Sequence, residues 1–326
     1  MVGVPVSDAT QWEQTESVGD CSHPIFKCLE KLAAQGEVIF QDDTPQRVLA
    51  LIEENQQATA QAHAQGKVKT DERTGMQTTA LIVQVGERRI CLYYTGRRHA
   101  GENLARLLAQ RAPGRAKPLV RSDALKSNQA AEEELMRCQC LAHGRRKFSE
   151  LDEDFPAESA VVVKALQLVF DHDAQARAER LTAQERLAYH QRKSGPIMKK
   201  LKRWLEQQTA QRLVEPNSSL GKAIAYLLDH WPTLTRFLTE PDAPIDNNLA
   251  ERALKLGIRQ RKHSLFYASE HSASIASVLT SVIATCVQAG VNALDYLVAV
   301  QEHRPEVCTN PRAWLPWNYL AALAPS

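Results

Sequence analysis

The sequence has almost no excess charge, because 40 lysines and arginines stand against 38 aspartates and glutamates, a formal net charge of +2. This balance excludes the argument that a basic surface as a whole attracts nucleic acid, so any such contact must come from local cationic clusters. Apolar residues make up 44% of the 326 residues, which is typical of a globular chain with one large domain or two ordinary ones.

Three further features are missing from the sequence. The seven cysteines are scattered and do not have the spacing of a disulfide framework, as expected in a reducing compartment. No apolar run is long enough to span a membrane, and the first residues do not show the charged-then-apolar pattern of a signal peptide. The sequence therefore predicts a cytoplasmic protein.

Helix-starting polar residues, an acid and several cations are concentrated in the stretch from Pro244 to Phe266, which reads PIDNNLAERALKLGIRQRKHSLF. Asn248 is predicted to cap a helix in which Glu251 falls at the third position, so the simplest interpretation is a capping box. The helix dipole keeps a carboxylate at this place ionised. An ionised acid among cations also suits a site that holds metal ions against a phosphate backbone. This stretch by itself slightly favours the capping interpretation. The cations around the acid are Arg252, Lys255, Arg259, Arg261, Lys262 and His263.

Two other acidic segments follow short apolar runs that predict buried strands. Residues 36–40 lead directly into Asp42 and Asp43, and residues 117–121 lead into Asp123. Acids just past strand ends can point into one shared site. The alternative is that they form a turn before a proline in the first case and a helix cap in the second. The residues alone leave both interpretations open.

Several blocks of the sequence, in the same order, resemble those of insertion-sequence-66-family transposases. The blocks are PIDNNLAERALK in the stretch above, QDDTP at 41–45, SDALKSN at 122–128, CLAHGRRKF at 140–148, HSLFYAS at 263–269 and NPRAWLPWNY at 310–319. The resemblance implies an α/β fold with an RNase H-like mixed sheet flanked by helices. It also implies that Asp42, Asp123 and Glu251 are the catalytic, metal-binding acids, with Asp43 as the alternative to Asp42. Asp123 is followed by Ala-Leu, where many family members have Gly-Tyr.

The resemblance further implies a reaction and its partners. Two Mg²⁺ or Mn²⁺ ions would serve hydrolysis of one DNA strand at an element end, and the freed 3′-hydroxyl would then attack target DNA. No covalent enzyme intermediate is needed, in keeping with the lack of a clear nucleophile motif. The implied partners are DNA, further copies of the chain on paired ends and auxiliary proteins encoded by the element, in the cytoplasm at the nucleoid.

Cationic residues near the predicted acids are candidate contacts to the phosphate backbone. Any one of them could equally be part of a solvated helix face, but two clusters beside two candidate acids favour DNA binding. These residues are Arg145, Arg146, Lys147, Arg252, Lys255, Arg259, Arg261 and Lys262.

Cys140 and His143 form a C-x-x-H pair with Cys138 two residues earlier. A structural zinc site usually needs four ligands in two spaced pairs, and the sequence offers no second pair of the right type. The resemblance instead implies a structural role near the active site for this pair, and likewise for Asn247 and Asn248.

Periodicity divides the chain into five predicted segments. Within the long helical one, Thr182 and Glu185 predict a capping box, and Pro196 predicts the first residue of another helix. Residues 78–85 and 88–94 predict a hairpin. The segments are a helical lead-in at 1–35, the first part of the core at 36–148, a helical insertion at 149–243, the final catalytic helix of the core at 244–284 and a helical tail at 285–326.

Two alternatives to a transposase remain at this point. One is another nuclease on the same fold, which would yield no strand-transfer product. The other is a truncated or inactive remnant that only binds DNA or partner subunits. The remnant is a serious alternative, because relatives usually carry an N-terminal DNA-recognition region, and the sequence places Met1 close to the first core strand.

Overall fold

The computed structural model describes residues 6–67, 73–122 and 135–324, and these belong to two compact units. The first unit takes in the chain up to Lys117 and again from Leu249 onward, and the second takes in the stretch from Pro118 to Asn248. The fold is α/β, with three strands paired in the first unit and two strands paired in the second.

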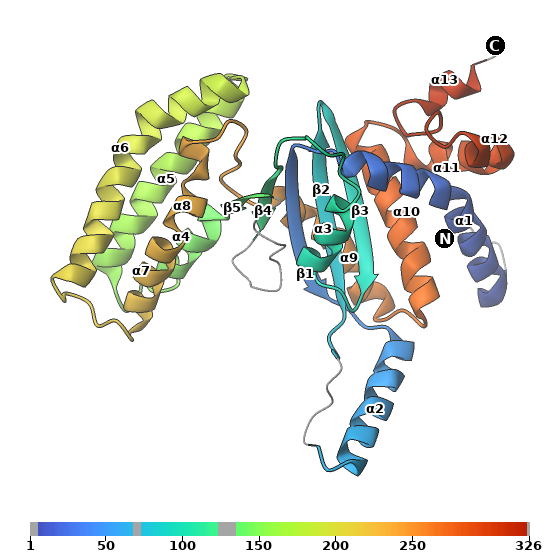
Figure 1. Cartoon of the computed structure of the whole chain (residues 1–326), viewed down its shortest axis with the longest axis horizontal. Helices are drawn as coiled ribbons and strands as arrows, with labels where there is room; N and C mark the ends of the chain where they lie inside the picture. Colours follow the sequence, from blue (N-terminus) through green and yellow to red (C-terminus); the bar gives the residue numbers. More distant parts are fainter. Residues whose placement is uncertain (1–5, 68–72, 123–134, 325–326) are drawn as a thin grey trace. The chain divides into compact units, whose positions relative to one another are not determined.

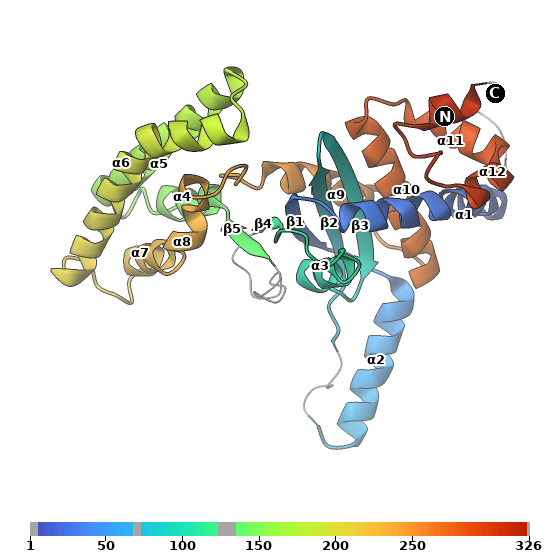
Figure 2. The same ribbon diagram turned by 45° about the horizontal axis from the view of Figure 1, so that its top comes forward.

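The first unit is built on an antiparallel meander of three strands, β1 (Val38–Pro45), β2 (Gln77–Val85) and β3 (Arg88–Gly96) (Figure 1). The predicted hairpin is confirmed, and Gly86 forms its turn with a φ of 56°, a left-handed conformation that glycine adopts without strain. Between β1 and β2 the chain forms α2 (Leu49–Ala64), which extends away from the sheet in both views (Figures 1 and 2).

Helices cover both faces of this meander. Helix α9 (Asn248–Ser264) packs on one face, where Leu254 joins a core cluster with Ala80, Ile82 and Tyr93. On the other face, α1 (Asp8–Ala33) contacts β3 through a hydrogen bond from the Tyr94 hydroxyl to the Glu30 carboxylate. Helix α3 (Ala100–Leu108) comes directly after β3 in the chain. Ser7 caps the start of α1, because its hydroxyl accepts a hydrogen bond from the Thr10 amide.

The free edge of β3 is covered by a helix, α10 (Glu270–Gln288), which supplies side-chain partners for the strand. The hydroxyls of Thr285, Ser281 and Ser277 accept hydrogen bonds from the amides of Cys91, Tyr93 and Thr95, at 3.1, 2.8 and 3.2 Å. Four helical residues rise about 6 Å and two strand residues about 6.6 Å, so the two spacings nearly match. Helix α10 is long and apolar enough to cross a membrane, but in this structure it is half-buried and packs on β3 and α1.

The C-terminal part of the first unit is helical. After α10 come α11 (Ala293–Glu302), α12 (Arg304–Thr309) and α13 (Tyr319–Leu323), and the first two of these pack on α1.

The second unit joins two parallel strands, β4 (Leu119–Ser122) and β5 (Met136–Gln139), to a group of helices. The Thr182–Glu185 capping box is confirmed at the start of α6, but Pro196 lies inside that helix and does not begin a new one. The helices are α4 (Leu141–Ser149), α5 (Pro156–Ala178), α6 (Ala183–Ala210), α7 (Ser219–Asp229), α8 (Trp231–Leu234) and a 3₁₀ turn at Arg236–Leu238.

Candidate active site

Asp42 and Asp43 lie within β1, so the expectation that they follow the end of the strand is wrong. The pairing of β1 with β2 continues to Pro45 opposite Gln77, and Asp42 and Asp43 pair with Ala80 and Thr79. Successive side chains of a strand point to opposite faces of the sheet. The two adjacent acids therefore belong to different surroundings.

Asp43 faces the helix α3 side of the sheet, where hydrogen bonds tie it into the fold. Its carboxylate accepts bonds from the Thr79 hydroxyl at 2.6 Å and the Ala100 amide at 2.8 Å, and the His99 ring lies 3.3 Å away. Burial raises the pKa of Asp43, although these hydrogen bonds act in the opposite direction. This acid joins β1 to β2 and to the first turn of α3, and it is poorly placed to bind an exogenous ion.

Asp42 faces the side of the sheet that α9 covers, because Phe40 and Thr44 flank it at two-residue spacing and both meet that helix. Phe40 packs on the core cluster that contains Leu254, and the Thr44 hydroxyl accepts a hydrogen bond from Arg261 at 3.1 Å. The Asp42 side chain is half-buried, and its Oδ1 accepts a bond from the Asp43 amide.

Gly257 lies where the middle of α9 passes over the sheet. A Cβ atom at this position would be in ordinary van der Waals contact, 3.4 Å from the Thr78 methyl and 3.9 Å from the Thr44 methyl. The backbone of α9 therefore lies close over β1 and β2 at this point.

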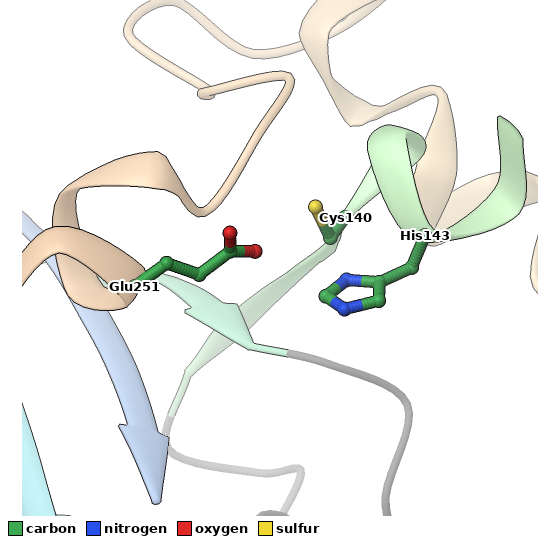
Figure 3. A group of neighbouring side chains, drawn as sticks. All are labelled: Cys140, His143 and Glu251. Carbon is green, nitrogen blue, oxygen red and sulfur yellow. The ribbon is translucent and has the colours of Figure 1, made fainter. Parts of the chain in front are cut away.

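Glu251 extends from the first turn of α9 (Figure 3). It is half-buried and lies three residues before Leu254, which is buried against the sheet, so the two side chains share one face of the helix. Asp42 thus lies on the face of β1 that α9 covers, and Glu251, more than two hundred residues later in the sequence, lies in the first turn of that helix. The third predicted acid, Asp123, lies outside the described residues.

The start of α9 differs slightly from the capping prediction. The helix begins at Asn248 itself, one residue earlier than an Asn248 cap requires, and the Asn248 amide donates to the Asp246 carboxylate at 3.2 Å. Asn247 is completely buried. The two asparagines therefore lie where the chain enters the helix that carries Glu251.

In the second unit, Cys140 directly precedes α4 and His143 lies in its first turn (Figure 3). Burial raises the pKa of the Cys140 thiol, but the hydrogen bond with His143 and the charge of Arg121 outweigh it, so that the pKa lies below its usual value. Arg121 is fully buried and donates to the Ile245 carbonyl. Sequence reasoning missed this arginine, because a cation in a short strand gives no signal of its burial.

The predicted DNA-binding cations have different environments. On α9, Arg252, Lys255, Arg259 and Lys262 are exposed, whereas Arg261 is half-buried and bonded to Thr44 and to the Pro45 carbonyl. On α4, the Lys147 ammonium lies 4.6 Å from the ring centre of Tyr226, and Arg145 and Arg146 line a cavity of about 380 Å³ together with Asp246 and Asn248. Only some of these cations are therefore free to meet a ligand.

Comparison with known proteins places the chain in a family. The model of the family described as "Transposase IS66 family" matches residues 1–275. Uncharacterized protein y4jD of Sinorhizobium fredii (strain NBRC 101917 / NGR234) is 31% identical over 187 residues, 56% of this chain and 36% of the relative. Uncharacterized protein y4hP of the same strain is 31% identical over 200 residues, 57% of this chain and 35% of the relative. The chain spans about a third of the length of these relatives.

No solved structure matches the chain. The family match covers most of the sequence and includes the stretches that carry Asp42 and Glu251. The chain belongs to the IS66 family of transposases.

Proposed function

We propose that the protein is a DNA transposase with an RNase H-like core, whose catalytic acids are Asp42, Asp123 and Glu251. One observation carries this proposal: α9, which has Glu251 in its first turn, packs over the face of β1 to which Asp42 belongs, although the two acids come from distant parts of the chain. The antiparallel meander followed by two parallel strands, with helices on both faces, is the arrangement expected of that core.

The residues present suit a hard divalent cation. Mg²⁺ prefers oxygen ligands and keeps part of its water shell, and Asp42 and Glu251 offer carboxylate oxygens that are only partly buried. Two such ions, when bound, would activate the attacking water or hydroxyl and stabilise the leaving oxygen. Asp42 and Glu251 would hold them on opposite sides of one interface, and Asp123 would complete the set.

The exposed cations of α9 would hold the DNA. Arg252 directly follows Glu251, and further cations continue along the same helix, so a phosphate backbone bound there would pass beside the acids. Water would attack a phosphodiester, with the 3′ oxygen as leaving group, and the resulting 3′-hydroxyl would attack a second phosphodiester in target DNA. The chain itself supplies position and charge and forms no covalent bond to DNA.

The decisive experiment compares the two adjacent acids of β1. Purified protein is incubated with Mg²⁺ or Mn²⁺ and duplexes from the ends of the DNA element that carries its gene. Asp42→Asn and Glu251→Gln should each lower strand cleavage by a factor of at least about a thousand, while leaving the unfolding midpoint nearly unchanged. Asp43→Asn should retain cleavage in its folded fraction but unfold more easily. Full cleavage by Asp42→Asn would contradict the assignment.

The reaction products separate the remaining alternatives. A transposase yields strand-transfer product in which the element end is joined to a target duplex. Cleavage without that product would indicate a nuclease. DNA binding without cleavage by the wild-type chain would indicate a remnant.

A further inference from the structure

Two large apolar side chains are exposed at the end of the helix that carries Glu251. Leu265 and Phe266 are 60% and 44% exposed, and they close a run of five exposed residues that begins at Lys262. Exposing such side chains forgoes the favourable free energy of burying them. A pair of them, side by side in the sequence and bordered by cations, is a recognisable feature of this surface.

The backbone holds this pair in a fixed and strained position. Leu265 has a φ of 63°, a left-handed conformation that side-chain-bearing residues rarely adopt, and its amide donates to the Arg261 carbonyl at 3.0 Å. Tyr267, which follows the pair, is held by two backbone hydrogen bonds. The Tyr267 amide donates to the Arg47 carbonyl at 2.9 Å, and its carbonyl accepts from the Leu49 amide at 2.8 Å. The exposed pair therefore stands on a rigid base between α9 and the end of β1.

The exposed cations of α9 lead directly to this pair. Arg252, Lys255, Arg259 and Lys262 follow one another at spacings of three, four and three residues, which places them along one side of the helix. They extend over about 15 Å, the length of roughly four nucleotides of one DNA strand. Helix α9 ends at Ser264, two residues beyond Lys262, and Leu265 and Phe266 are the next two residues of the chain.

We propose that Leu265 and Phe266 are a DNA-distorting wedge, which inserts between two bases of the strand that the cations of α9 hold. This inference rests on the proposed transposase function and adds a binding element to it. Apolar side chains that enter a base step unstack it at a cost in free energy, and aromatic rings restore part of the stacking. A rigid, exposed Leu–Phe pair at the end of a phosphate-binding stripe meets the requirements for such a wedge.

The test uses duplexes with 2-aminopurine at successive positions of the element end, since this base becomes brightly fluorescent when it is unstacked. Binding of the wild-type chain should raise the fluorescence several-fold at one or two adjacent positions. The double variant Leu265→Ser/Phe266→Ser should bind with an unchanged salt dependence and give no rise. Leu294→Ser, at a position 71% exposed on α11, is the matched control and should behave as the wild type does.

A second measurement connects the wedge to the reaction. The double variant should cleave a fully paired element end at least about tenfold more slowly, and a mismatch at the fluorescent position should restore most of the rate, because the base step is then already open. A wild-type fluorescence rise in the double variant would overturn the wedge. The wedge would also be overturned if the double variant, in the absence of DNA, lost a self-association that the wild-type chain shows, because the pair would then be a contact between protein chains. A wild-type chain that neither binds nor cleaves DNA would instead remove the proposed function.

Discussion

At the scale of single residues, Asp173 shows how the second unit accommodates a buried charge. Its carboxylate is completely buried in α5 and meets Arg177 at 2.6 Å, Arg186 at 3.1 Å and His190 at 3.2 Å. Burial raises the pKa of Asp173, but the hydrogen bond from His190 and the two arginines outweigh it and lower the pKa below its usual value. The ionised form is therefore the one that the folded unit stabilises.

Asp173→Asn should lower the free energy of unfolding by about 3 kcal/mol at neutral pH, because it removes the ionised, buried carboxylate that Arg177, Arg186 and the buried His190 ring share. An acid with a lowered pKa stabilises the fold above its unfolded pKa of about 3.9, and this contribution is lost as the pH falls through the lower folded value. The difference between wild type and variant, measured by urea unfolding, should be constant from neutral pH to about pH 5 and shrink below about pH 4. Asp171→Asn, an exposed neighbour on the same helix, should change stability by less than about 0.5 kcal/mol. A difference between wild type and Asp173→Asn that did not depend on pH would contradict this account.

The residue scale is also where the sequence was most ambiguous. In the sequence, Asp42 and Asp43 are equally good candidates for the first acid. The resemblance does not decide between them, because shifting the alignment with the family by one residue would exchange the two. The structure separates their surroundings, because Thr79, His99 and Ala100 surround the second acid and α9 faces the first. Partners such as these come from other elements, so no local pattern around the two acids could have revealed them.

At the scale of elements, α10 takes the place of a neighbouring strand at the edge of β3. Three amides of β3 would otherwise be unpaired along an edge that could recruit another chain. Ser281 and Ser277 also donate to the carbonyls of Ser277 and Ala273 one turn earlier, so these two hydroxyls are fixed by the helix as well as by the strand. Helix α10 is rich in serine, which is unusual for a buried helix, because serine hydroxyls serve as acceptors for the edge amides of β3.

Ser281→Ala should lower the free energy of unfolding by about 1–3 kcal/mol, because it leaves the buried Tyr93 amide without an acceptor. Chemical denaturation measures the change, and hydrogen exchange locates it, since the Tyr93 amide should lose protection more than its neighbours do. The matched control is Ser274→Ala on the exposed side of the same helix, for which we expect almost no effect. Equal losses in the two variants would show that helix propensity and not the edge contact is responsible.

Elements with strong local signals could be predicted from the sequence. The hairpin of β2 and β3 and the Thr182–Glu185 capping box each depend on neighbouring residues, and each is present. Pro196 misled the prediction, because a proline after a glycine usually begins a helix, whereas α6 runs through both residues. The end of β1 was misplaced for a similar reason, since its polar residues find partners on other strands and helices.

At the scale of the whole molecule, the candidate site depends on bringing distant segments together. The pattern around Glu251 predicts a helix start and the apolar run before Asp42 predicts a strand, but neither predicts that the two acids face one interface. That expectation came from the resemblance to a family. The nearly neutral composition likewise gives no hint that one side of α9 carries four exposed cations in line.

The low net charge makes a quantitative prediction about DNA binding. In a chain with a net charge of +2, the salt dependence of binding must come from local cations, and the exposed stripe on α9 is such a source. Each single variant Arg252→Ala, Lys255→Ala, Arg259→Ala or Lys262→Ala should weaken binding uniformly across sequences and reduce the slope of log K against log salt by about 1. Fluorescence anisotropy with a labelled duplex over a range of salt concentrations measures that slope. The control Lys199→Ala/Lys200→Ala removes two exposed cations of α6 in the other unit and should leave the slope unchanged. If this control lowered the slope as much as two α9 substitutions do, binding would be a property of the dispersed surface charge, and the path of DNA along α9 would have to be abandoned.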